Sequence, residues 1–273
     1  MPKGICKLCL RYEELRRSHF VPRALYENLR APGYEPVQLT SKVVRPTSRQ
    51  TADYLLCNDC EQLLSKNGER WVLPRLAKYN ASFPLYDLLT EKPPVFDDGH
   101  LAVYATAGNP DVDRESLINF AIGLFWKASV HPWSGERQEA RIDLGDVGGN
   151  LRQFLLGQAA LAENVALVLI LIPPPVSLIA TTDPIRGSNP EFANYHSYLP
   201  GLFMNLCVGA DVRERMKGTC IVSNPHGPVT VQDVTPDIRA MLHSVGAGAY
   251  KTKKLVETQA EIIVKQLHKE PQS

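Results

Sequence analysis

Four cysteines with regular spacing are the first residues whose types and positions suggest chemistry. Cys6 and Cys9 form one C-x2-C pair, Cys57 and Cys60 form a second, and 47 residues separate the two pairs. Each pair can place two thiolates on one side of a tight turn, and two such turns complete the tetrahedral shell that Zn(II) prefers. The spacing therefore predicts a structural zinc site, with four buried thiols that hold no metal as the alternative. Because four thiolates leave no open coordination position, we expect catalysis, if any, to occur elsewhere.

One histidine stands between the two cysteine pairs, in the segment Ser-His-Phe-Val-Pro at residues 18–22. This residue, His19, lies ten residues after Cys9, in a stretch that we expect to form a strand of a hairpin opened by the first cysteine pair. A neutral imidazole can take a proton from water, which is the task of a general base. A lone histidine can equally be a structural residue, and the sequence leaves both interpretations open.

The order of these motifs resembles the zinc-ribboned branch of the HNH endonucleases. The matching features are a C-x2-C pair, a polar residue before His19, two apolar residues and a proline after it, a variable loop, and Leu-Leu-Cys-x2-Cys opening a helix. That family has a ββα-metal core, in which two strands and a helix hold one catalytic divalent cation. The resemblance covers about residues 4–70, a quarter of the chain. It implies that His19 is the general base that activates water.

The resemblance also implies oxygen ligands for a catalytic Mg(II) or Mn(II) ion. The family usually has an acidic ligand before the histidine, where this chain has Ser18, and a ligand after the last cysteine, where it has Glu61. The family's middle asparagine has no clear counterpart, and Asp53 or Gln50 is the nearest candidate. A subgroup with Ser-His-Ile-Ile-Pro and Leu-Cys-x2-Cys-Glu motifs has a further glutamate downstream, which makes Glu69 a candidate ligand. Glu61 and Glu69 can equally be exposed acids of a helix.

Charge is distributed unevenly along the chain, although the net charge is only +1. Residues 1–50 contain ten lysines and arginines against four acids, so this segment carries +6 and the remainder −5. Such asymmetry is typical of a chain whose basic part binds a polyanion, although a solvated basic surface without a partner gives the same pattern. The candidate phosphate contacts are Arg16, Arg17, Arg23 and Arg30.

A folded framework must position these residues, and the composition is compatible with one. With 273 residues, of which 44% are hydrophobic, the chain can bury a core. We predict an α+β protein with a zinc-stapled ββα-metal (HNH-like) N-terminal module and a mixed C-terminal domain of helices and antiparallel sheet. The expected divisions are the module at residues 1–80, a connecting region at 81–112 and the second domain at 113–273.

Helical and strand patterns follow one another in the C-terminal part. One helix is predicted to begin after an N-cap at Asp113 and to end before Pro132, with a single apolar face, and a second to begin near Gly149. Apolar runs then predict a four- or five-stranded antiparallel sheet. These runs lie at residues 164–172, 176–182, 198–208, 218–223 and 228–234. Residues 236–244 and 252–268 are predicted to form closing helices.

No segment indicates membrane insertion. The most apolar stretch, at residues 165–180, is interrupted by three consecutive prolines, and each half is too short to span a bilayer. The N-terminal residues lack the apolar run of a signal peptide, so we expect a cytoplasmic protein. In a reducing cytoplasm the cysteines should not form disulfides, which favours metal ligation for the four paired ones.

The residues and the resemblance together predict an endonuclease that hydrolyses phosphodiester bonds in DNA. The resemblance extends this expectation to prokaryotic antiphage defence or a mobile element, with protein partners of a defence system. Two alternatives remain open. The first is a catalytically inactive zinc-ribbon module that binds nucleic acid or a protein, and the second is a structural zinc in a protein whose function resides in its C-terminal domain.

Overall fold

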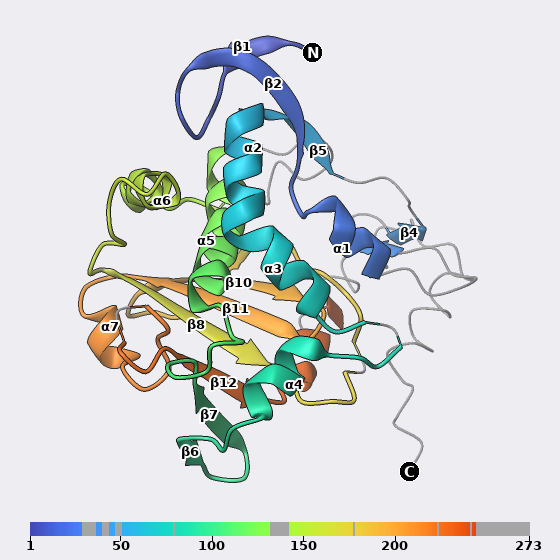
Figure 1. Ribbon diagram of the computed structural model, residues 1–273, viewed down its shortest axis with the longest axis vertical. Helices are drawn as coiled ribbons and strands as arrows, with labels where there is room; N and C mark the ends of the chain where they lie inside the picture. The colour runs from blue at the N-terminus through green and yellow to red at the C-terminus, as the bar shows by residue number, and fades with distance from the viewer. Residues whose placement is uncertain are drawn as a thin grey trace.

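The computed structural model describes residues 1–28, 37–39, 44–46, 51–78, 80–131, 142–176, 178–222, 224–240 and 242–243. Over these residues the protein is a mixed α+β structure with a cluster of four cysteines near its N-terminus. Figure 1 shows a small sheet at one end of the molecule and a larger sheet towards the other, with helices between them.

The first cysteine pair lies in the turn between the first two strands of the small sheet, and His19 ends the second of these strands. The antiparallel order of this sheet is β1-β2-β5, with β1 at Lys3–Ile5, β2 at Tyr12–His19 and β5 at Ala52–Cys57. A register shift between Arg16 and Arg17 interrupts the pairing of β2 with β5. Between these two strands the chain forms the short helix α1 (Arg23–Asn28) and an antiparallel pair, β3 (Val37–Leu39) with β4 (Val44–Pro46).

A continuous helical column follows β5. It begins with α2 (Asn58–Leu64), widens into a π-helical turn, η1 (Ser65–Glu69), and continues through α3 (Arg70–Val72) into a 3-10 turn, η2 (Leu73–Arg75). No side chain caps the N-terminus of α2, but Asp59 and Glu61 lie in its first turn, where carboxylates stabilise the positive end of the helix dipole. The column therefore starts directly at the second cysteine pair.

The helix α5 (Arg114–Val130) runs beside this column, in contact with α2, η1 and α3 (Figure 1). Asp113 is its N-cap, since the carboxylate accepts a hydrogen bond from the backbone N–H of Ser116 at 2.9 Å, as the sequence predicts. The prediction of a single apolar face on α5 is wrong, because thirteen residues of this helix are buried and they lie on all its sides. A second helix, α6 (Val147–Leu155), packs against α5 and begins two residues before the predicted start.

Among the residues described, the larger sheet has seven strands in the order β6-β7-β12-β8-β11-β10-β9. All neighbours are antiparallel except β12 and β8, which are parallel. The strands span Phe96–Asp97 (β6), Leu101–Ala105 (β7), Val165–Leu171 (β8), Ile185–Arg186 (β9), Ala193–Leu199 (β10), Leu202–Val208 (β11) and Pro228–Gln232 (β12). The short helix α4 (Pro84–Thr90) precedes these strands in the sequence, and α7 (Val212–Arg215) lies between β11 and β12.

The predicted strands are confirmed only in part. The runs at 164–172 and 228–234 contain β8 and β12, but the run expected at 198–208 is divided by a turn at Pro200 and Gly201 into β10 and β11. Gly201 has a positive φ of 78°, which suits a glycine at this turn. Residues 178–182 form no strand, and 218–222 contribute one isolated bridge, from Cys220 to Val168. Residues 96–105, which we assigned to the connecting region, supply β6 and β7.

One hydrophobic core joins the cysteine region to the larger sheet. A single cluster of buried residues extends from Cys6 through α5 to Val231 on β12. Residues 235–240 and 242–243 are helical, whereas the closing helix predicted at 252–268 lies outside the described residues. In the part of the chain that the structure describes, no helix has both the length and the apolarity needed to cross a bilayer.

Candidate metal centre and active site

The two cysteine pairs converge on one point, as their spacing predicts. The sulfur atoms of Cys6, Cys9, Cys57 and Cys60 all lie within 4.8 Å of one another. The Sγ atoms of Cys9 and Cys57 are 3.8 Å apart. A tetrahedral zinc with Zn–S bonds of about 2.3 Å holds its sulfurs about 3.8 Å apart, so the four side chains fit such a metal. The cluster can therefore bind a metal ion such as zinc.

Local backbone geometry brings the first pair to the second. The turn after Cys6 closes through a bond from the Leu10 N–H to the Cys6 carbonyl at 2.9 Å, with Leu10 in the left-handed region at φ 63°. The N–H of Lys7 donates to the carbonyl of Leu55 on β5 at 3.1 Å. The N–H of Cys57 in turn points at the Cys6 sulfur, 3.3 Å away. These bonds bring the sulfurs of the two pairs close together.

The four thiols perturb one another strongly. A hydrogen bond from the Cys60 thiol lowers the pKa of Cys6 to about 4, and the same contact together with burial raises the pKa of Cys60 far above its usual range. Burial also raises the pKa of Cys57. One thiolate therefore forms easily, whereas ionisation of further thiols is unfavourable, because several negative charges would then lie close together in a partly buried site. A divalent metal would remove that repulsion.

Ser18 and Glu61 form a bonded pair beside the metal centre. Ser18, which is 1% exposed, accepts a hydrogen bond from the Leu56 N–H at 3.2 Å and donates its own hydroxyl proton to the Glu61 carboxylate. Both residues were candidate cation ligands. The structure brings them together, with the serine hydroxyl fixing the orientation of the carboxylate on α2.

His19 occupies the last position of β2, opposite Ala52. Its ring is half-buried, and within the described residues no hydrogen bond to that ring is found. Burial lowers its pKa below the ordinary 6.5, and the positive charges of Arg17, Arg23 and Lys127 lower it further, while Glu69 opposes them. The imidazole is therefore neutral at pH 7 and able to accept a proton.

The carboxylate of Asp53 bonds to a residue that follows α5. The backbone of Asp53 pairs with that of Ser18, but its carboxylate contacts His131, which follows α5, at 3.0 Å through Oδ2. Its other oxygen accepts the N–H of Tyr54 at 2.7 Å. His131 therefore lies at the junction between the small sheet and α5, although its sequence context is that of an ordinary loop histidine.

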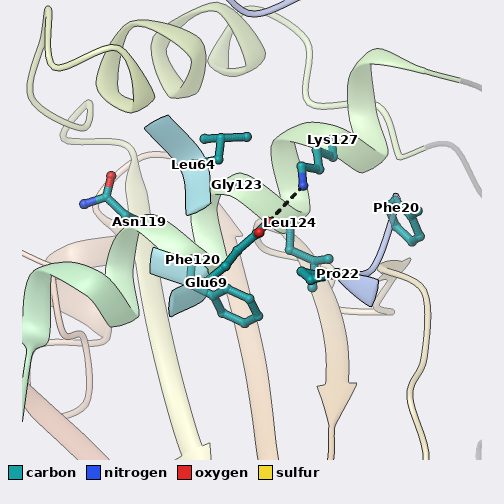
Figure 2. A pocket seen from close by; sticks show the side chains of 9 residues that line it. All are labelled: Phe20, Pro22, Leu64, Glu69, Asn119, Phe120, Gly123, Leu124 and Lys127. Atoms are coloured by element: carbon teal, nitrogen blue, oxygen red, sulfur yellow. Dashed lines mark hydrogen bonds and ion pairs between the residues drawn. The ribbon is translucent and has the colours of Figure 1, made fainter. Parts of the chain in front are cut away.

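Glu69 ends the π-helical turn and forms an ion pair with Lys127 of α5 (Figure 2). The Nζ and Oε1 atoms are 3.1 Å apart, and the two side chains are 5% and 20% exposed for lysine and glutamate. The pair borders a small hollow that is also lined by Phe20 and Pro22, which follow His19 in the sequence. Glu69 is thus a partly buried residue near His19 and not an exposed helix acid.

The candidate cation ligands do not converge as the cysteines do. In the described part of the chain, the four cysteines are the one group of three or more His, Cys, Asp or Glu side chains with ligand atoms close enough to share a metal. Among the candidate phosphate contacts, Arg17 and Arg23 are exposed and Arg16 is half-buried, whereas Arg30 lies outside the described residues, as does Gln50.

Comparisons with protein-family models, with curated proteins and with solved structures found no match to this chain. Any functional inference therefore depends on the residues and their geometry. The residue that sequence reasoning missed is Lys127, which stands alone as a charge within the apolar run Ile-Gly-Leu-Phe-Trp-Lys-Ala at residues 122–128. A charge in such a run is itself a signal, because lysine is rarely buried without a partner.

Proposed function

We propose that the chain is an HNH-type, metal-dependent endonuclease that hydrolyses phosphodiester bonds in DNA, with β2, β5 and α2 as its ββα unit. The order of these elements supports the proposal, since two antiparallel strands are followed directly by a helix. The cysteine cluster lies at the junction of β5 and α2, where a structural zinc would hold the unit together.

The observation that carries the proposal is the state of His19. A half-buried imidazole with a lowered pKa, and with no hydrogen bond to it among the described residues, is suited to take a proton from an attacking water. A histidine retained for stability would normally bond to a neighbouring group, because an unsatisfied buried polar atom costs free energy. His19 is therefore the general base in this proposal.

Carboxylates near His19 are the oxygen donors available for a Mg(II) or Mn(II) ion. Glu61 and Glu69 each bond to a protein donor through Oε1, and either one would bind the cation with water completing the shell. Such a cation would offset the negative charge that develops on the phosphodiester in the transition state. Arg16, Arg17 and Arg23 would neutralise flanking phosphates without reading the base sequence.

The resemblance of the motifs to HNH nucleases extends the proposal to a biological setting. Nucleases of this kind commonly serve prokaryotic defence against phage, or mobile elements. In that setting protein partners would direct the nuclease to its target, and the domain after residue 112 is the part of the chain we assign to that contact.

Plasmid cleavage is the direct test. Zinc-loaded protein should nick supercoiled DNA when Mg(II) or Mn(II) is added, and mild chelation of the added ion should stop the reaction while the zinc content stays constant. Single-stranded DNA and RNA should be assayed in parallel. If none of these substrates is cut with any common divalent cation, the nuclease proposal is wrong.

A second candidate function is a zinc-ribbon module that binds nucleic acid or protein without catalysis. The pairing of Ser18 with Glu61, of Glu69 with Lys127 and of Asp53 with His131 favours it, because each carboxylate already has a protein partner. The same protein preparations distinguish the two functions, since a binding module retains DNA affinity and cuts nothing.

A further inference from the structure

Lys127 is a charged residue of α5 whose side chain is buried. The other charged residues of α5, Arg114 and Glu115, lie in its first turn, whereas Lys127 lies in the last turn with its side chain only 5% exposed. Its neighbours Trp126 and Ala128 are buried. Lysine is rarely buried to this extent unless an acid is present.

The acid that accompanies Lys127 is Glu69, which lies 58 residues earlier in the chain. Figure 2 shows the lysine side chain extending to the glutamate, at a hollow that Phe20 and Pro22 also line. Phe20 and Pro22 lie one and three residues after His19, so the ion pair and the segment that carries the proposed base line the same hollow.

Stability alone is a weak reason for such a pair. Desolvation of two charges offsets most of their attraction, and a well-packed apolar pair of similar volume is often as stable or more stable. An uncharged pair would have apolar neighbours here, because Leu64, Phe120 and Leu124 line the same hollow. A charged pair in this place is better explained by the orientation that Lys127 gives to the Glu69 carboxylate.

The backbone around Glu69 is held tightly enough to make that orientation precise. The π-helical turn Ser65–Glu69 is a geometry that often occurs at functional sites. Gly68, the residue before Glu69, lies against the backbone of Phe120 on α5, closer than any residue with a Cβ could approach. Glu69 is thus anchored through the backbone on one side and through Lys127 on the other.

We propose that Lys127 is a positioning residue of the nuclease site, which holds the Glu69 carboxylate in the orientation needed beside His19. This inference depends on the proposed function and extends it, because it makes α5 a part of the site. The ββα unit would then be incomplete without a helix that begins at residue 114.

The test compares four variants of the full-length, zinc-loaded protein. Lys127→Met removes the ammonium, Lys127→Arg keeps a positive charge, and Glu69→Gln/Lys127→Met replaces the ion pair with uncharged groups of similar size. Lys66→Met, an exposed lysine on the same π-helical turn, is the matched control. For each variant we would measure zinc content, the free energy of unfolding, DNA affinity and the cleavage rate at saturating DNA.

Lys127→Met should lower the cleavage rate by about 10- to 100-fold, the usual effect of removing a group that orients a functional side chain. DNA affinity and zinc content should stay at wild-type values, and Lys127→Arg should recover part of the rate. The double variant should regain the stability that Lys127→Met loses, without regaining cleavage. Lys66→Met should cut at the wild-type rate.

Four results would overturn the inference, one of them together with the proposed function. Recovery of both stability and cleavage in the double variant would show that the pair serves only packing. A loss of DNA affinity equal to the loss of rate would show that Lys127 contacts phosphate instead. If the wild-type protein cuts no nucleic acid, the proposed function and this inference fail together, whereas active wild type with fully active Lys127→Met removes the inference alone.

Discussion

Gly68 of the π-helical turn lies directly against the backbone of Phe120 on α5. A Cβ atom at Gly68 would be 2.8 Å from the Phe120 nitrogen and 2.9 Å from its Cα. Both neighbours are backbone atoms, which cannot move aside as a flexible side chain can. This contact sets how closely the column that starts at the cysteine cluster approaches α5.

Substitution of Gly68 by alanine should therefore be destabilising. Forcing the two helices apart is an overpacking change, which costs about 1–3 kcal/mol, and denaturant unfolding would measure it. Gly149→Ala is the control, because Gly149 is an exposed helical residue with no heavy atom within 4 Å of a Cβ. That change should be neutral or stabilising by up to about 1 kcal/mol, since alanine favours a helix. Equal effects at both positions would contradict the packing argument.

Purified protein should contain about one zinc per chain, bound through the four cysteines. Cys57→Ser should lose the metal, because three thiolates at this site bind more weakly than four. The strands β1, β2 and β5 should then exchange their amide hydrogens much faster, while β8, β10 and β11 keep their protection.

Elemental analysis and hydrogen exchange would measure these effects. Cys220→Ala serves as the control, since Cys220 is buried far along the chain and donates to the Val222 carbonyl at 3.4 Å. It should leave the zinc content unchanged. Wild-type protein without zinc, expressed in zinc-sufficient medium, would refute the prediction.

His19→Ala should separate catalysis from folding. If His19 is the general base, cleavage should fall by about 10²- to 10⁴-fold, while zinc content, stability and DNA affinity stay near those of the wild type. His226→Ala, at an exposed loop histidine, should change none of these quantities. A structural role for His19 predicts instead that stability and activity decrease together.

DNA binding should weaken steeply as salt increases if the N-terminal basic residues contact phosphate. The logarithm of affinity should fall by about 0.9 per phosphate contact for each unit of log salt concentration. Replacing Arg16 and Arg17 together with alanine should flatten this slope by about one to two contacts. Arg215→Ala on α7, where the guanidinium pairs with Glu191 at 2.6 Å, should not change the slope. A DNA affinity that does not change with salt concentration would instead indicate that these residues bind a protein partner.

Stability should decrease on mild acidification because of His196. Burial lowers the pKa of this ring below 6.5, and its Nε2 lies 2.6 Å from the Asn194 amide nitrogen, an arrangement that suits an unprotonated acceptor. As pH falls below 6.5, the unfolded chain binds a proton that the folded ring resists, so the free energy of unfolding falls with pH. His196→Phe should reduce the pH dependence of the free energy of unfolding between pH 6.5 and 5, whereas His226→Phe should leave that dependence unchanged. An unchanged slope in His196→Phe would exclude His196 as the cause.

Local patterns allowed correct prediction where local bonds determine the structure. Each C-x2-C turn is built within a few residues, and the Asp113 cap forms with an N–H only three residues away. That the two turns meet was predicted from the four ligands that zinc requires, and not from local bonds. The turn at Pro200 and Gly201 was also visible in the sequence, but the apolar residues on both sides led us to predict one strand where the chain forms two.

Contacts between distant segments could not be predicted in the same way. Nothing near Glu69 in the sequence indicates a partner at Lys127, and the two meet because Gly68 allows α5 to approach. The resemblance to HNH nucleases suggested both Ser18 and Glu61 as cation ligands, yet a hydroxyl and a carboxylate also bond well to each other. The sequence pattern does not indicate whether Ser18 and Glu61 bind a cation or bond to each other.

The position of β12 in the larger sheet has a consequence for synthesis on the ribosome. β12 pairs with β7 on one side and β8 on the other, so residues 228–232 complete a sheet whose other strands precede them in the chain. Until those residues emerge, β7 and β8 each present an edge that has no permanent partner, and such edges favour aggregation. A nascent chain that stalls before residue 228 would therefore be a substrate for chaperones, although the six other described strands of this sheet would already have been made.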